Sequence, residues 1–498
     1  MRASWSQRLT AVLAALIIPA AVPGCAREGG DQAPAVIRIA TTAPKDPGQG
    51  GVVGLDYMTG VLVRETLGSI GRDGRVTARL AEQWTVSDDG REWLFQLRPN
   101  VVFHDGTKLT SDVLVPLLKS RLTGLAEVEE IAAAGPLAVR IRLRRASPFL
   151  LEEVAFESLG LGPQRQIGTG PFKLMPAADG PIRFVPFDQY RLGTPGVTEV
   201  TLTQYSNLRN TWVALMKGDA DVVYEVSGEA RDFVDAETSV ELASFVRPYV
   251  YLLGINHMRP PFRDANVRVA MNMGIDRGAL IDQGLKGFGI PAYDHFWPAH
   301  WAVDSSRSRI DRDRGKAISL LQERFPVKAA PPRMPSRFRF HCLVYEPLER
   351  LGLALQRQFA EMGIDMSIET LQLGPLVART LKGDFDAFLF EMASARSLSF
   401  PYRFWHSPAP GAQMPQFGYA SADAMLDRVR YARSDDEIRA AVADLQAHFK
   451  ADPPAIFLAW SETARAVTTR FVVPREQDED IFHSIFRWKP VAPAPRTN

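Results

Sequence analysis

The stretch Leu80–Leu114 reads LAEQWTVSDDGREWLFQLRPNVVFHDGTKLTSDVL and carries the clearest fold signal in the chain. Its first Asp-Gly pair separates two apolar runs, and Trp93, Phe95 and Leu97 recur with a period of two, which predicts a hairpin with one buried face. A second Asp-Gly pair ends another strand, and Thr110 is placed to cap the helix that opens at SDVL. The stretch has no evident nucleophile, metal-ligand spacing or phosphate loop, so we expect it to be scaffold.

The same stretch resembles the signature of the family 5 extracellular solute-binding proteins, the dipeptide, oligopeptide and nickel receptors of ABC importers. Residues 247–291, which include RPPFRDANVRVAMNMGIDRGAL, and residues 419–460 carry further parts of the resemblance. The resemblance covers nearly the whole chain that would follow a signal peptide. It implies an α/β protein with the two-lobed periplasmic-binding-protein (Venus flytrap) fold and an extra small subdomain on lobe I.

The motif Lys-Gly-Asp-x-Asp occurs twice, at 217–221 and at 382–386. Each copy lies between an apolar helix and a strand, where a glycine readily ends the helix. The recurrence is either a coincidence in a common helix–glycine–strand join or one corresponding unit in each of two α/β lobes. The second interpretation agrees with the resemblance.

With the resemblance, the chain divides into five predicted segments. We expect a signal peptide over 1–24, a lipidated tether over 25–35, lobe I over 36–252 with its small subdomain at about 66–167, lobe II over 253–464, and a return to lobe I with a C-terminal tail over 465–498. The chain between SDVL and GTGPF is short for the family. We therefore expect a trimmed small subdomain, which would alter one wall of the ligand cavity.

The N-terminus has the features of a secretory signal. Arg2 and Arg8 precede an apolar run over residues 9–22, which is short for a membrane span because a spanning helix needs about 20 apolar residues. The run ends VPGC and resembles a bacterial lipobox, apart from the unusual Pro23. We expect Cys25 to be lipidated and the protein to reside in the periplasm or cell envelope, anchored to the membrane. The alternative is an ordinary signal peptide with an incidental cysteine.

The composition excludes several other classes of protein. A formal net charge of +1 gives no reason to expect a nucleic-acid partner. The second cysteine, Cys342, lies in an apolar strand and is expected to be a core thiol, so no intrachain disulfide forms once Cys25 is acylated. The eight histidines are dispersed and no zinc-type spacing is present, so we expect no metal site and no cofactor. A nickel chelate that needs one histidine stays open as a ligand.

Ligand contacts are expected beyond the carboxyl ends of the strands in both lobes. In the family's peptide receptors, an aspartate that pairs with the peptide amino terminus lies in the loop that here contains Ala395, and Arg396 stands beside that position. Because a guanidinium favours a carboxylate or phosphate, we expect Arg396 to hold an anionic group. The alternative is a surface loop with aromatic residues packed beneath it. The full set of candidate ligand contacts is Gln49, Tyr57, Tyr224, Glu225, Glu391, Ser394, Arg396, Tyr402 and Trp405.

The predicted function is that of a substrate-binding lipoprotein of an ABC importer, which captures a small solute, peptide or peptide-like, in an inter-lobe cleft and delivers it to the permease subunits. One alternative is a protein of this family for an opine, an oligosaccharide or a metal chelate. Another is a secreted hydrolase, but neither G-x-S-x-G nor H-E-x-x-H occurs. A DNA-binding regulator on this scaffold is disfavoured by the secretion signal and by the lack of room for a helix-turn-helix before residue 36.

Overall fold

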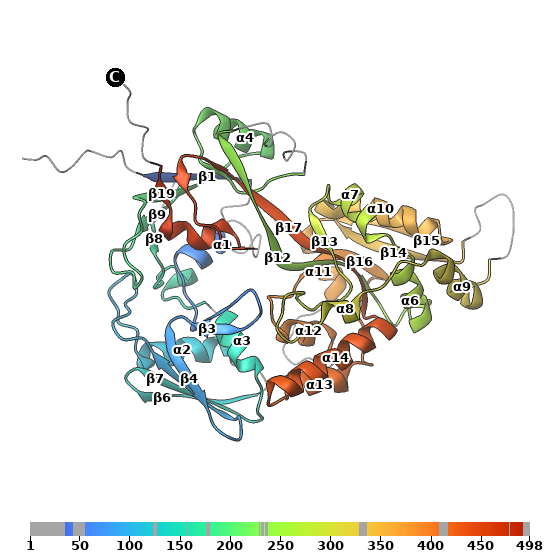
Figure 1. Ribbon diagram of the computed structural model, residues 1–498, viewed down its shortest axis with the longest axis horizontal. Helices are drawn as coiled ribbons and strands as arrows, with labels where there is room; N and C mark the ends of the chain where they lie inside the picture. The colour runs from blue at the N-terminus through green and yellow to red at the C-terminus, as the bar shows by residue number, and fades with distance from the viewer. Residues whose placement is uncertain are drawn as a thin grey trace, which may run out of the picture. The chain divides into compact units, whose positions relative to one another are not determined.

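The computed structural model describes residues 35–42, 55–122, 127–156, 158–175, 180–228, 230, 234, 238–327, 336–407, 417–477 and 479–491. Helices and strands alternate along these residues, and most strands join one large mixed sheet (Figure 1). The predicted α/β fold class is confirmed. Within this part of the chain, no helix combines the length and the apolar character that crossing a membrane requires.

The large sheet has the order β15-β14-β16-β12-β17-β11-β1-β10-β9-β8, with β13 paired to β17. Its longest strands, β12 and β17, pair antiparallel and connect the strands around β1 with those around β14 (Figure 1). The strand bounds are β1 Val36–Thr41, β8 Phe172–Met175, β9 Ile182–Pro186, β10 Glu199–Gln204, β11 Val222–Val223, β12 Val240–Ile255, β13 Gly289–Pro291, β14 Phe338–Tyr345, β15 Ile364–Leu371, β16 Ala387–Ala393 and β17 Ala455–Thr468.

A separate sheet, β4-β5-β7-β6, contains the predicted hairpin. Trp93, Phe95 and Leu97 are buried, as their alternation predicted, and Val86 pairs with Trp93 next to the Asp-Gly turn. This small sheet packs with two helices around its own apolar core. The elements are β4 Ala81–Val86, β5 Glu92–Leu97, α2 Ser111–Leu122, β6 Val128–Gly135, β7 Ala138–Leu143 and α3 Phe149–Phe156, with the short pair β2 Gly68–Ile70 and β3 Val76–Ala78 nearby in the chain.

Several helices begin at a side-chain cap that the sequence supplies. Asp264 accepts the N–H of Asn266 and starts α6, and Asp276 accepts the N–H of Ala279 and starts α7. The apolar residues Leu351, Leu355 and Phe359 are buried and share one face of α10, Glu349–Ala360. The remaining helices are α1 Leu55–Leu62, α4 Leu208–Lys217, α6 Ala265–Gly274, α7 Arg277–Gly284, α8 Ser305–Ser308, α9 Arg314–Arg324, α10 Glu349–Ala360, α11 Leu373–Leu381, α12 Ser399–Trp405, α13 Asp423–Arg430 and α14 Asp435–Ala451.

The cores on the two sides of the β12–β17 pair are distinct. One cluster gathers around β1 and includes Ile39 and Leu202, and another gathers around β14 and includes Val344 and Leu355. Cys342 belongs to the second cluster and is fully buried, as expected, and burial raises the pKa of its thiol. The residue bounds that the sequence suggested for the lobes stay predictions.

The two Lys-Gly-Asp-x-Asp motifs have the same structure. The glycine of each, Gly218 and Gly383, has a left-handed φ of 76° and 69°, a conformation that costs glycine little. In each motif the chain leaves a helix at this glycine and enters a strand, β11 after the first copy and β16 after the second.

The last aspartate of each motif also has the same role. Asp221 precedes β11 and accepts the backbone N–H of Arg38, from the parallel neighbour β1, at 3.0 Å. Asp386 precedes β16 and accepts the backbone N–H of His341, from the parallel neighbour β14, at 3.0 Å. The carboxylate thus satisfies an N–H at the start of a parallel pair, which explains why the same motif occurs at both joins.

The two aspartates differ in their surroundings, and this difference predicts their contributions to stability. Asp221 is fully buried and also binds the Arg38 guanidinium at 2.8 Å and Arg470 at 2.7 Å, whereas the Asp386 side chain is 35% exposed with Arg259 at 3.6 Å. We expect Asp221→Ala to lower the free energy of unfolding by about 3 kcal/mol and Asp386→Ala by about 1 kcal/mol. Urea unfolding followed by circular dichroism measures both, and equal losses would contradict the larger role that burial and two arginine partners give Asp221.

Candidate functional site

A break in the pairing of β12 with β17 lies at the centre of the candidate site. The register shifts between Val246 and Val250, and a bulge of this kind re-aims the side chains that it contains. Pro248 lies in the bulge, where its missing N–H is tolerated. Its carbonyl accepts the N–H of Ser394 at 2.8 Å, and this bond ties the loop after β16 to β12.

Beside the bulge, Arg247 pairs with the predicted ligand residue Glu391. The shortest nitrogen–oxygen distance is 3.2 Å, and the side chains are 22% and 23% exposed. The Arg247 guanidinium also lies over the ring of Tyr249, 4.4 Å from its centroid. Burial raises the pKa of Tyr249 and of Tyr251 to about 12, so both phenols keep their protons and can donate hydrogen bonds at neutral pH.

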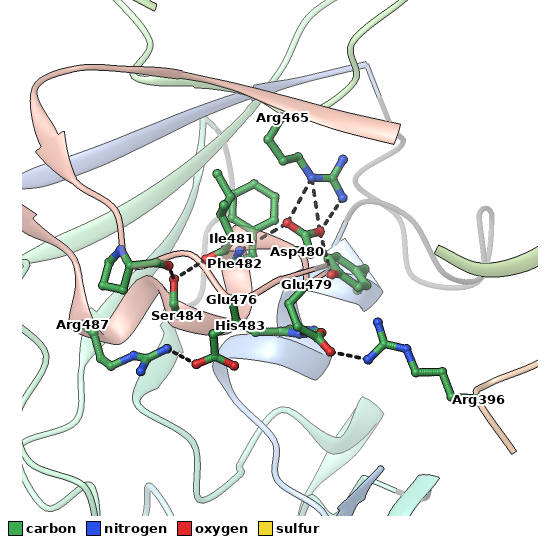
Figure 2. Close-up of polar contacts among 12 residues, drawn as sticks. Arg396, Arg465, Glu476, Glu479, Asp480, Ile481, Phe482, His483, Ser484 and Arg487 are labelled. Atoms are coloured by element: carbon green, nitrogen blue, oxygen red, sulfur yellow. Dashed lines mark hydrogen bonds and ion pairs between the residues drawn. The ribbon is translucent and has the colours of Figure 1, made fainter. Parts of the chain in front are cut away.

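Arg396 has contacts on several sides, of which Figure 2 shows the one with Glu479. Its guanidinium forms an ion pair with Glu479 and lies 5.2 Å from the ring centroid of Trp297. Ala395 and Arg396 have φ values of 53° and 57°, a left-handed conformation that is costly for residues other than glycine. A side chain at Gly74 would come within 2.8 Å of the Arg396 carbonyl oxygen, so the turn at Gly74 also confines this loop.

Glu479 is the site residue that sequence reasoning missed. It lies just before the short 3-10 helix η3, Ile481–Arg487, in the segment after β17. Burial alone would raise the pKa of its carboxyl group, but the bond to His483 Nδ1 at 3.1 Å and the Arg396 charge outweigh burial and lower it. Glu479 is therefore an anion at neutral pH. The acidic run QDED at 477–480 was the available signal, but nothing in the sequence links it to Arg396.

Two predicted tyrosines lie next to Glu479 in a packed polar network. The Tyr57 hydroxyl donates to Asp480 at 2.7 Å. Arg465 pairs with Asp480 at 2.6 Å (Figure 2). Tyr224 is buried, with Arg465 4.0 Å from its ring centroid. Burial raises the pKa of Asp480, but Arg465 outweighs this effect and lowers it below its ordinary value. The network fixes the segment that carries Glu479.

The other predicted ligand residues have varied surroundings. Glu225 accepts the Thr41 hydroxyl at 2.8 Å, which places it at the end of β1. Ser394 is fully buried beside Arg396. Tyr402 and Trp405 are packed in a hydrophobic core, where Tyr402 donates to Asp427 at 3.2 Å and Trp405 donates to His295 Nδ1 at 2.9 Å. Gln49 and Cys25 lie outside the described residues.

The structure thus brings Glu391, Ser394 and Arg396 together along one strand and loop, opposite Glu479 and its tyrosine network. It does not bring Tyr402 and Trp405 to this group. Among the residues with described positions, no cluster of three or more histidines, cysteines, aspartates and glutamates could hold a metal ion. His295 and His300 are buried, and burial lowers their pKa values to about 3 and about 4.

Sequence comparison identifies relatives over most of the chain. Residues 75–412 match the model of the bacterial extracellular solute-binding proteins, family 5 Middle. The probable D,D-dipeptide-binding periplasmic protein DdpA of Escherichia coli strain K12 is 25% identical over 337 residues, which cover 62% of this chain and 64% of that protein. The dipeptide-binding protein of the same strain is 23% identical over 360 residues, which cover 61% and 65%. The match therefore spans less than two thirds of these relatives.

Solved structures cover nearly the whole chain at low sequence identity. NikZ of Campylobacter jejuni, in complex with Ni(L-His), has a TM-score of 0.76 at 19% identity and covers 91% of this chain and 99% of its own. The oligopeptide-binding protein AppA of Bacillus subtilis, in complex with a nonapeptide, has a TM-score of 0.75 at 18% identity and covers 92% and 100%. These likenesses establish the two-lobed periplasmic-binding-protein fold. The chain belongs to the bacterial extracellular solute-binding proteins of family 5.

Proposed function

We propose that this protein is the substrate-binding component of an ABC importer. It captures a small solute, a peptide or a peptide-like molecule, between lobe I (36–252) and lobe II (253–464) and delivers it to the permease. The observation that supports this function is the meeting of Arg396, from the loop after β16, with Glu479, from the returning C-terminal segment. Charged groups from both proposed lobes thus meet at one place.

Capture depends on a difference in free energy between the open and closed lobes. A solute shifts this equilibrium only by as much as it binds the closed state more tightly. Groups that come from both lobes supply such a difference, because they surround the solute together only when the lobes close. Arg396 and Glu391 lie on the β16 side, and Glu479 and Tyr57 lie on the β1 side of the β12–β17 pair.

The charges of the site favour a solute that carries both signs. The planar guanidinium of Arg396 suits a carboxylate or phosphate, and the ionised Glu479 suits an ammonium group. A peptide or peptide-like solute offers both. Proteins of the same fold hold very different solutes, such as Ni(L-His) in NikZ and agropinic acid in AgaA. We therefore infer the solute class from the side chains and not from the fold.

We also propose that Cys25 is lipidated and tethers the protein to the membrane in the periplasm. The lipobox-like VPGC sequence supports the anchor, and the periplasmic relatives support the compartment. The relatives are solute-binding proteins by name, which supports a transport role without catalysis.

Native mass spectrometry of the protein purified from its own host tests the function. We expect the spectrum to show a bound small solute of defined mass, which is released when the protein unfolds. When it is added back to refolded protein at 100 times its Kd, it should stabilise the fold by about 2.7 kcal/mol. A protein that converts the added molecule into a product would contradict a purely binding role.

Arg396 should contribute directly to solute affinity. A charge-assisted hydrogen bond is worth about 1.5–3 kcal/mol, so we expect Arg396→Ala to weaken binding by roughly 10- to 150-fold. Arg396→Lys should recover part of this loss because lysine lacks the planar fork. The control is Arg339→Ala, at an exposed arginine paired with Asp365. Calorimetric titration of the identified solute decides the matter, and equal affinity for wild type and Arg396→Ala would exclude Arg396 as a contact.

The anchor has its own test. We expect Cys25→Ser to move the protein from the membrane fraction to the soluble periplasmic fraction, because the thiol that would carry the lipid is gone. Immunoblots of fractionated cells measure this distribution. A variant that stays in the membrane fraction would contradict lipidation at Cys25.

A further inference from the structure

Helix α12 begins without a cap from its own sequence. Leu398 stands at the N-cap position, and no local side chain bonds the first turn. Instead, the N–H groups of Leu398 and Ser399 donate to the two carboxylate oxygens of Glu152, at 3.1 and 2.9 Å. Glu152 belongs to α3 and precedes these residues by 246 and 247 positions in the chain. The acceptor therefore comes from a distant part of the chain, from a helix that packs with the small sheet β4-β5-β7-β6.

The contact between α3 and α12 includes further groups. Phe156 meets Phe400 edge to face, with ring centroids 5.1 Å apart, and Glu153 forms an ion pair with Arg403. On α3, the neighbouring Glu153 acts on Glu152 through its charge, and Arg403 of α12 pairs with Glu153. The strands β2 and β3, which also contact α3, carry no charged residue. The hydrogen-bond partners of Glu152 are thus the backbone N–H groups of Leu398 and Ser399 and the Ser399 hydroxyl.

We propose that Glu152 is a positioning residue for the loop over residues 394–399. It caps α12 from the opposite lobe, so this loop becomes ordered only when the two lobes dock. This inference rests on the proposed function and adds regulation to the same site. When the lobes separate, the two N–H groups lose their acceptor and the first turn of α12 frays. Arg396, two residues before the cap, then loses the geometry in which it would meet a solute.

The protonation of Glu152 should couple docking to pH. In the docked lobes, burial raises the pKa of Glu152 to about 7, although the N–H groups of Leu398 and Ser399 oppose this effect. In separated lobes the group returns to its ordinary pKa of 4.5. At pH values between 4.5 and 7, docking is therefore accompanied by protonation of Glu152. It becomes more favourable as the pH falls from 7 toward 4.5, and this gain is absent above pH 7.

His300 acts in the opposite direction. It faces the turn at Gly74, and burial lowers its pKa to about 4, so docking releases a proton from it below its ordinary pKa of 6.5. The total pH dependence of docking is therefore the sum of opposing contributions. The contribution of Glu152 is isolated by comparing wild type with Glu152→Gln, which keeps an oxygen acceptor but cannot ionise.

Hydrogen–deuterium exchange with fragment mass spectrometry tests the inference without any solute. After correction for intrinsic rates, we expect Glu152→Ala to speed exchange in residues 398–400 about fivefold, the usual effect of a lost cap. Glu152→Gln should have a smaller effect. From pH 6 to pH 8, exchange of wild type relative to Glu152→Gln should rise roughly tenfold. Glu82→Gln, at an exposed acid of β4, is the matched control and should behave as wild type.

Two results would overturn the inference. The first is unchanged exchange of residues 398–400 in Glu152→Ala, and the second is a pH dependence that persists equally in Glu152→Gln. Exchange in β14 serves as an internal reference for folding, because this strand lies in a separate core and should not respond to any of the variants. Since no solute enters the experiment, its failure is distinct from a failure to find a transported solute.

Discussion

The antiparallel pairing of β12 with β17 is the interaction on which the other features of this structure depend. It runs from Val240 opposite Thr468 to Gly254 opposite Ala455, and the cores around β1 and β14 lie on its two sides. The pairing is interrupted beside Pro248, and the groups of the candidate site gather there. With continuous pairing, the Arg247 side chain would point in another direction. The Pro248 carbonyl would then not be placed to accept the N–H of Ser394 from the loop after β16.

Local chemistry explains the parts of the fold that the sequence predicted. The alternation of Trp93, Phe95 and Leu97 predicted a buried strand face, because this signal acts over a few residues. Asp264 and Asp276 likewise cap α6 and α7 through residues two or three positions away. The repeated Lys-Gly-Asp-x-Asp motif is also local, and its two aspartates satisfy equivalent N–H groups. Its recurrence therefore reflects one physical requirement, met twice, at the start of a parallel strand pair.

The candidate site was less predictable because its partners are distant in the chain. The sequence predicted Arg396 from its place after a strand and from the missing aspartate, but its partner Glu479 lies 83 residues later. Glu152 was not predicted at all, since its role follows from the contact of α3 with α12. An aromatic residue in a loop is equally compatible with a ligand contact or with core packing, and the structure packs Tyr402 and Trp405 in a core.

The central claim is that groups from two lobes surround a solute when the lobes close. Small-angle X-ray scattering of the solute-free protein, before and after addition of the solute that copurifies with it, tests this claim most directly. The account predicts a smaller radius of gyration with solute, and a much weaker change in the Arg396→Ala variant at the same solute concentration. An identical radius of gyration with and without saturating solute would contradict the account.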